Sequence, residues 1–222
     1  MARPVIFGDA SHPHVRSITF ALAEKDITYT LVPREQAPLL TQGGEQRIPL
    51  HCNLGEPALE YRGTIVSGAD TVLRFVDEAF AGPRLQPADP LGRARMNRVM
   101  ELYFREAVHT MGRQVAYRYL VAFLSGEYAP DLSERSLVQA QNTVAEFERL
   151  LAEGPFFAGV DFSLADIAIG SLFENLFELA DFRTIVARES ALNAWWERIS
   201  SRSALKVTQE ALAPVYGLLH AA

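Results

Sequence analysis

The first part of the chain alternates between short apolar runs and a helical period. Residues 4–7 (PVIF) form an apolar run that ends at a Gly-Asp pair, which is typical of a buried strand. Apolar residues then recur at helical spacing over residues 13–25, with Pro13 in the first turn. Residues 28–32 (TYTLV) are β-branched and aromatic and predict a second strand. A strand, a helix and a strand in so short a span predict a βαβ unit with parallel strands.

A second group of elements follows after an irregular stretch. Residues 33–56 are rich in Pro, Gly and Gln, and we expect an irregular segment there. Residues 58–61 and 64–66 flank an Arg-Gly pair, which predicts a β-hairpin with a short turn. Residues 67–70 (SGAD) precede another helical period and predict a capping-box type of helix start, with Asp70 in place of the usual Glu or Gln. The predicted order is βαβ, loop, ββα.

Helical periodicity dominates the rest of the chain. Residues 79–92 hold three prolines and two glycines without an apolar period, so they predict a linker. Amphipathic helices are predicted over residues 93–124, 133–152, 163–180, 191–200 and 204–213. The sequence therefore predicts an α/β domain over residues 1–78, a linker over 79–92 and an all-helical domain over 93–222.

Composition is that of an ordinary globular protein. The 222 residues are 49% apolar and 22% charged, which is enough to bury a core without disulfides. With 21 basic and 27 acidic residues the net charge is −6, which argues against binding to nucleic acid or to an anionic membrane. The start has no signal-peptide pattern and no apolar run reaches about 18 residues, so we expect a cytoplasmic protein outside the membrane. One cysteine, Cys52, and scattered histidines predict no disulfide framework and no metal site.

Four short motifs follow one another along the chain: residues 7–16 (FGDASHPHVR), 56–59 (EPAL), 85–95 (LQPADPLGRAR) and 162–168 (FSLADIA). In this order and at this spacing they resemble the cytosolic glutathione transferase family. There they would be the active-site turn, a strand that begins at a cis-proline, the interdomain linker and a helix start of the second domain. The resemblance covers nearly the whole chain. It implies a thioredoxin-like α/β domain, an all-α helical bundle and a homodimer.

The resemblance also implies a reaction, in which the thiolate of glutathione, the co-substrate, attacks a small hydrophobic electrophile in detoxification. A free thiol has a pKa near 8.5, so only about 3% is ionised at pH 7. A donor at the positive end of a helix can lower that pKa by about one or two units. Serine-type members of the family carry the donor hydroxyl just before the position of Pro13, where this chain has His12, and Ser11 lies one residue earlier. Three interpretations stay open: Ser11 donates, the Nε2–H of His12 donates, or neither meets the thiol and Ser11 only caps the helix.

Two further places complete the glutathione site that the resemblance implies. Glu56, before Pro57, would pair its backbone with the cysteinyl part of glutathione. At the third helix the family has an acid followed by Ser, which hold the γ-glutamyl end, and the matching positions here are Gly68 and Ala69. Helix N–H groups and the Ser67 hydroxyl remain for the carboxylate. The ammonium group of the γ-glutamyl end, however, has no acidic side chain to bind at these positions. This loss would weaken glutathione binding roughly ten- to a hundredfold.

These departures leave alternative functions beside the transferase. The chain could be a non-catalytic ligand- or partner-binding protein on the same fold, or an enzyme that works without glutathione, with His12 as acid or base. Ser163 and Asp166 resemble a structural capping box. The aromatic residues of the helix from residue 93 fit either the bundle core or a pocket for the electrophile.

Overall fold

The computed structural model describes residues 2–33, 40–42, 45–47, 57–116, 132–151, 154–177, 182 and 185–210. These residues form two compact units. The first takes in the described residues up to Arg84 together with the helix that starts at Ser203, and the second runs from Leu85 to Arg202. The domain boundaries predicted from the sequence stay a prediction.

A four-stranded sheet forms the centre of the first unit. Its strands are β1 (Val5–Phe7), β2 (Thr30–Val32), β5 (Ala58–Tyr61) and β6 (Thr64–Ser67), in the order β2-β1-β5-β6. β1 is parallel to β2, whereas β1–β5 and β5–β6 are antiparallel, so the predicted βαβ unit and hairpin are both confirmed. The turn between β5 and β6 has positive φ at Arg62 and Gly63, as the tight turns that suit a twisted hairpin require.

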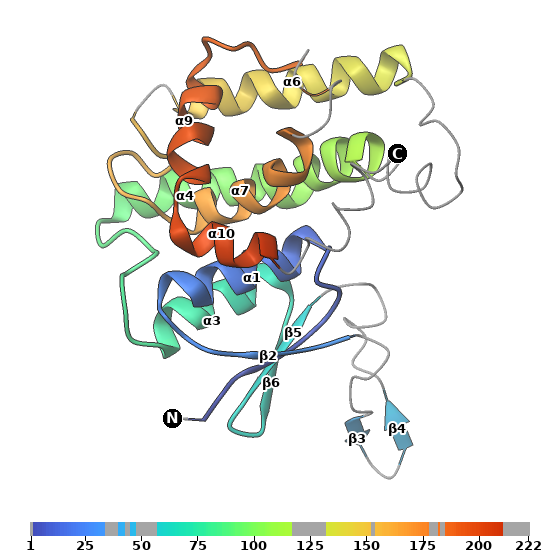
Figure 1. The fold of residues 1–222 in the computed structure, drawn as a ribbon, viewed down its shortest axis with the longest axis vertical. Coiled ribbons are helices and arrows are strands. Elements are labelled where there is room, and N and C mark those ends of the chain that lie inside the picture. Colours follow the sequence, from blue (N-terminus) through green and yellow to red (C-terminus); the bar gives the residue numbers. More distant parts are fainter. Residues whose placement is uncertain are drawn as a thin grey trace. The chain divides into compact units, whose positions relative to one another are not determined.

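Helices α1 (Pro13–Glu24) and α3 (Ala69–Ala79) lie side by side against this sheet, and α10 (Ser203–Glu210) packs on α1 (Figure 1). Side chains alternate across the sheet as the strand period requires. Ile6 and Leu59 pair across β1 and β5 and are fully buried. Phe7 and Ala58 point the other way, into a small second cluster. The sheet is therefore apolar on both faces.

A second hairpin corrects one expectation. β3 (Leu40–Gln42) and β4 (Glu45–Arg47) form an antiparallel pair inside the segment that we expected to be irregular. Each strand has three residues and is largely polar, so the sequence shows neither alternation nor a β-branched run there. Cys52 and Glu56, from the same segment, lie outside the described residues.

The second unit is helical, as predicted. It contains α4 (Pro90–Leu102), the π-helix η2 (Tyr103–Ala116), α6 (Glu134–Leu151), α7 (Leu164–Phe177) and α9 (Ala191–Ser200). Its core is aromatic: Phe147, Phe173 and Trp195 are fully buried and meet edge to face. Tyr103 and Met111 are also fully buried, so these two side chains belong to the bundle core.

Helix α4 begins three residues earlier than predicted. Asp89 is its N-cap, and the Asp89 carboxylate accepts the backbone N–H of Gly92 at 2.8 Å. Pro90 takes the first helical position, where its missing N–H costs nothing. The start predicted at residue 93 is wrong because the Asp-Pro pair is a cap followed by a first turn, and we interpreted it as part of the linker.

Within the described residues, no helix combines the length and the apolar character needed to span a bilayer.

Candidate functional site

At the end of the sheet where β1 leads to α1 and β6 leads to α3, four residues pair with one another across the four strands. Val32 pairs with Phe7, Phe7 with Ala58, and Ala58 with Ser67. In β1 and β6 the chain then continues into α1 and α3, whereas in β5 it has just entered the sheet. Segments that are far apart in sequence therefore meet at this end of the sheet.

The residues one step beyond this row are in close contact. The backbone N–H of Gly68 donates to the carbonyl of Pro57 at 3.1 Å. A Cβ atom on Gly8 would lie 3.8 Å from the Cβ of Pro57 and only 2.6 Å from Cγ2 of Val15, so only glycine fits where β1 turns toward α1. Pro57 is buried between these turns. The predicted active-site turn, proline and third-helix start are thus brought together.

At the start of α1 the cap is formed by His12. Its φ and ψ of −74° and 129° are those of an N-cap, and its Nδ1 accepts the backbone N–H of His14 at 3.2 Å. The two imidazole rings meet edge to face with centroids 4.9 Å apart. Ser11 is exposed and lies one residue before the cap, so the interpretation that Ser11 caps the helix is wrong. The reason is that Pro13 occupies the first helical position, which leaves the cap to its neighbour.

At the start of α3 the predicted capping box is also wrong. Ser67 is still the last residue of β6, and Gly68 is the N-cap, with a φ of +87° and no side-chain hydrogen bond. Both carboxylate oxygens of Asp70 accept from Nε of Arg74, at 3.0 and 3.1 Å. The Asp70 carboxylate is therefore bound to a side chain of its own helix. Ala69 is buried, and Ser67 is half-buried beside it.

This end of the sheet can hold an anionic group by its backbone. The first N–H groups of a helix point outward and carry partial positive charge, and α1 and α3 both begin here. A peptide-like ligand could also pair with the backbone before β5, as an added strand does. Because Glu56 is outside the described residues, its backbone pairing and the cis bond before Pro57 stay predictions.

Asp166 forms a second polar cluster, inside the helical unit. Its carboxylate accepts the backbone N–H and the hydroxyl of Ser163 at 2.9 and 3.0 Å. It also accepts the N–H of Phe157 at 3.1 Å and Nε1–H of Trp195 at 2.8 Å. Burial raises the pKa of Asp166 to about 6, although the hydrogen bonds from Trp195, Phe157 and Ser163 oppose this rise. The structural role predicted for Ser163 and Asp166 is seen, and the long-range Trp195 contact had no signal in the sequence.

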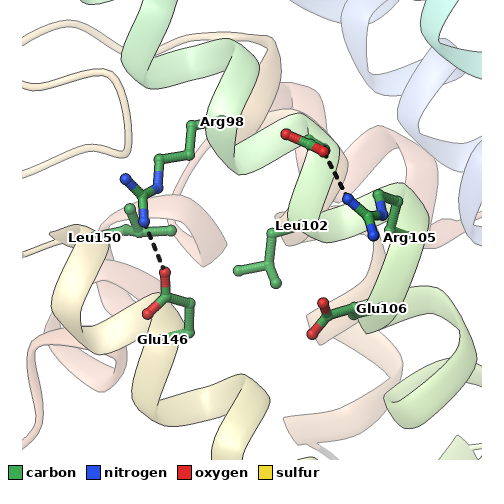
Figure 2. Close-up of a pocket in the computed structure, with 7 residues that line it drawn as sticks. Arg98, Leu102, Arg105, Glu106, Glu146 and Leu150 are labelled. Atoms are coloured by element: carbon green, nitrogen blue, oxygen red, sulfur yellow. Dashed lines mark hydrogen bonds and ion pairs between the residues drawn. The ribbon is translucent and has the colours of Figure 1, made fainter.

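A shallow cavity of about 180 Å³ lies in the second unit, between α4, η2 and α6. Figure 2 shows Arg98 of α4 reaching Glu146 of α6, at 3.3 Å, across its wall. Arg105 similarly binds Glu101 at 2.8 Å. None of the residues predicted to hold glutathione lines this cavity, and its arginines are bound to carboxylates of the same wall. We assign no substrate to it.

No group of three or more His, Cys, Asp or Glu side chains suited to a metal ion occurs in the part of the chain that the structure describes. What the two units do share with known proteins is their architecture. The β2-β1-β5-β6 sheet with α1 and α3 is a thioredoxin-like domain, and a helical bundle follows it. This combination defines a class of two-domain proteins.

Comparison with known proteins shows which family within this class the chain is similar to. Residues 128–207 match the family model described as glutathione S-transferase, C-terminal domain. Glutathione S-transferase 3 of Zea mays is 28% identical over 219 residues, which cover 96% of each chain. The solved structure of glutathione S-transferase III in its apo form superposes with a TM-score of 0.78 at 25% identity, over 95% of this chain and 97% of that one. Together these likenesses support the assignment of the chain to the glutathione S-transferase family.

A further relative is matched over a smaller share of its length. Protein IN2-1 homolog A of Oryza sativa subsp. japonica is 29% identical over 126 residues, or 54% of this chain, and this chain spans only 44% of that protein. Several relatives are named as transferases, so the comparisons do not favour the non-catalytic alternative.

Proposed function

We propose that this protein is a glutathione transferase that binds glutathione at the end of the sheet where α1, β5 and α3 meet. The observation that carries the proposal is that Pro57, before β5, accepts the N–H of Gly68 at the start of α3 and lies close to Gly8, where β1 turns toward α1. The names of the relatives support the same reaction. Glutathione would be a co-substrate, and a small hydrophobic electrophile would be the second substrate.

The site residues divide by the part of glutathione that each would meet. Ser11 and His12, at the start of α1, would lie by the sulfur. The backbone of Glu56 and Pro57 would pair with the cysteinyl residue. Ser67, Gly68 and Ala69, at the start of α3, would receive the γ-glutamyl carboxylate through a hydroxyl and backbone N–H groups.

The chemical step follows from thiol ionisation. The glutathione thiol releases its proton to solvent, and the thiolate is stabilised by a hydrogen-bond donor and by the positive end of α1. The sulfur lone pair then forms a bond to the electrophilic carbon, whose leaving group departs with its bonding electrons. The chain's own task is to raise the thiolate fraction and to fix the position of the sulfur.

Binding should be weaker than a complete γ-glutamyl site would give. Gly68 offers no carboxylate for the ammonium group, and Asp70 is engaged by Arg74. A missing charge-assisted bond typically costs about 1.5–3 kcal/mol, or roughly ten- to a hundredfold in affinity. We therefore expect a dissociation constant toward the millimolar range.

Two further features are proposed on the family alone. Because the motifs resemble the cytosolic transferases, we place the protein in the cytoplasm. For the same reason we expect a homodimer, which size-exclusion chromatography with light scattering would detect as twice the chain mass.

Calorimetric titration of glutathione into the protein near pH 7 tests the proposal. We expect a dissociation constant at or below about a millimolar, and turnover with an aromatic chloride that releases chloride ion. The analogue γ-glutamyl-serinyl-glycine serves as the matched control, since it should bind without turnover because it has no thiol. No heat and no thermal stabilisation at about ten millimolar glutathione would reject the transferase and favour the non-catalytic alternative.

A further inference from the structure

The start of α3 offers hydrogen-bond donors that suit a carboxylate. The first hydrogen bond of the helix runs from the Val72 N–H to the Gly68 carbonyl, at 2.9 Å. The N–H groups of Asp70 and Thr71 precede it and have no carbonyl of their own helix to bind. The Thr71 hydroxyl lies beside the N-cap, because a Cβ atom on Gly68 would be 3.8 Å from its Oγ1. Ser67 adds a second hydroxyl at the end of β6.

The same place has no side chain that suits a cation. Gly68 has no side chain, and Ala69 is an alanine. Asp70 is the acidic residue of the first turn, but both of its carboxylate oxygens accept from Nε of Arg74, one turn further along the helix, at 3.0 and 3.1 Å. The first turn of α1 contains no acidic residue. In the described first turns of the two helices, the one carboxylate is therefore bound to an arginine.

The two helices themselves also disfavour a cation here. The N-terminal end of a helix carries a partial positive charge, and α1 and α3 begin at the same end of the sheet. An ammonium group would give up its water without gaining a carboxylate. A carboxylate would gain the donors of α3 and the favourable potential of the helix. The start of α3 therefore discriminates between two groups that glutathione carries on one carbon atom, its α-carboxylate and its α-ammonium.

We propose that this site recognises the γ-glutamyl end of its thiol substrate as an anion only. The substrate class is that of cysteinyl peptides with a carboxylate on the acyl side, and the α-ammonium group contributes nothing to binding. Glutathione is then one member of this class, and a thiol peptide without the ammonium is bound at least as tightly. The inference rests on the proposed function and names the substrate class of the same site.

Two analogues of glutathione test the contributions of the two groups separately. Glutaryl-cysteinyl-glycine keeps the carboxylate and lacks the ammonium, whereas γ-aminobutyryl-cysteinyl-glycine keeps the ammonium and lacks the carboxylate. Each is titrated into the wild-type protein by calorimetry near pH 7, beside glutathione. We expect the glutaryl analogue to bind as tightly as glutathione or more tightly. The aminobutyryl analogue should bind roughly ten- to a hundredfold more weakly, because it loses a charge-assisted contact.

The outcomes distinguish this inference from the proposed function. Measurably tighter binding of glutathione than of the glutaryl analogue would overturn the inference and leave the transferase standing. Binding of the glutaryl analogue without glutathione would support the inference and reject glutathione as the co-substrate. If the wild type binds none of the three thiols, the proposed function is rejected and this inference with it.

Gly68→Asp should create the preference that the wild type lacks, and Gly68→Asn is the matched control. The two side chains have the same shape and meet the same strain at a φ of +87°, so they differ only in charge. We expect the dissociation constant of the glutaryl analogue, divided by that of glutathione, to rise roughly tenfold in Gly68→Asp and to keep its wild-type value in Gly68→Asn. Equal ratios in the two variants would overturn the inference. If strain prevents either variant from folding, the three titrations of the wild type decide.

Asp9 provides a second control. It is an exposed acid in the turn before α1, and its backbone carbonyl accepts the His12 N–H at 3.0 Å. Asp9→Asn should leave the ratio of the two dissociation constants unchanged, since the inference gives Asp9 no contact with the ammonium group. A changed ratio would assign the ammonium to Asp9 and overturn the inference.

Discussion

Asp166 is the buried carboxyl group whose ionisation should influence stability most clearly. Its pKa rises from 3.8 to about 6 on burial. Between these two values the folded protein holds a proton that the unfolded chain has released, so stability decreases as pH rises through this window. The contribution of the group is fully present below about pH 4 and is lost above about pH 6. A rise of this size corresponds to about 3 kcal/mol.

Comparing wild type with Asp166→Asn isolates this contribution. The amide does not titrate, and the other carboxylates act alike in both proteins. We expect the difference in free energy of unfolding to shift by up to about 3 kcal/mol in favour of the wild type as pH falls from 7 to 4. Urea unfolding at several pH values measures it. A constant difference would mean that the carboxylate stays ionised, with its four hydrogen bonds outweighing burial.

At the scale of elements, Lys25 joins the end of α1 to the end of α3. Its ammonium group donates to the carbonyls of Asp77, Phe80 and Pro83 at 2.9–3.2 Å, and it forms an ion pair with the Asp77 carboxylate at 3.0 Å. The side chains of Lys25 and Asp77 are only 1% and 5% exposed. A cation at the carboxyl end of a helix satisfies carbonyls that the helix itself leaves unpaired. Gly82 allows the close approach, because a Cβ there would lie 3.1 Å from Lys25.

Replacing this lysine should therefore loosen the first unit. Lys25→Met keeps the length of the side chain but leaves a buried carboxylate and three carbonyls without their cation. We expect a loss of about 3–5 kcal/mol in the free energy of unfolding, measured by urea titration. Asp77→Asn is the matched control, and it should cost less because the carbonyl bonds to Lys25 remain. Equal losses in the two variants would assign the whole effect to the ion pair.

Elements with a strong local signal could be predicted, and those without it could not. Helix α1 and the β5–β6 hairpin show clear periods and a turn dipeptide, and they form as predicted. The β3–β4 hairpin has no such pattern. Residues 67–70 have the sequence pattern of a capping box, but strand β6 continues through Ser67. The N-cap is therefore Gly68, which has a positive φ. Sequence patterns over a few residues cannot show where a strand stops pairing with its neighbour.

The candidate site was predictable only through the resemblance. Nothing in the local pattern brings Pro57 to Gly68, since their contact depends on strand order and register. The sequence did place Ser11 and His12 at a helix start. It could not show which of them caps the helix, because the cap depends on the backbone angles of His12 and on its hydrogen bond with the His14 N–H.

For the whole molecule, the order of the chain differs from the order of its compact units. Helix α10 follows the helical unit in sequence, yet it belongs to the first unit and packs on α1. Leu205 and Thr208 of α10 are buried there. The first unit is therefore completed only when the chain has passed through the second. Helix α1, at whose start Ser11 and His12 lie, therefore packs on a segment almost two hundred residues away in sequence.

Leu205→Ala tests this dependence, and Leu192→Ala in α9 provides the same change in the other unit. Both leucines are fully buried, so each substitution should cost about 2–5 kcal/mol. The location of the effect should differ. Amide hydrogen exchange should accelerate in α1 for Leu205→Ala, and in α7 and α9 for Leu192→Ala, because α9 packs on α7. Unchanged exchange in α1 of Leu205→Ala would contradict the role of α10. Faster exchange in α1 should also weaken glutathione binding, because the proposed site includes the start of this helix.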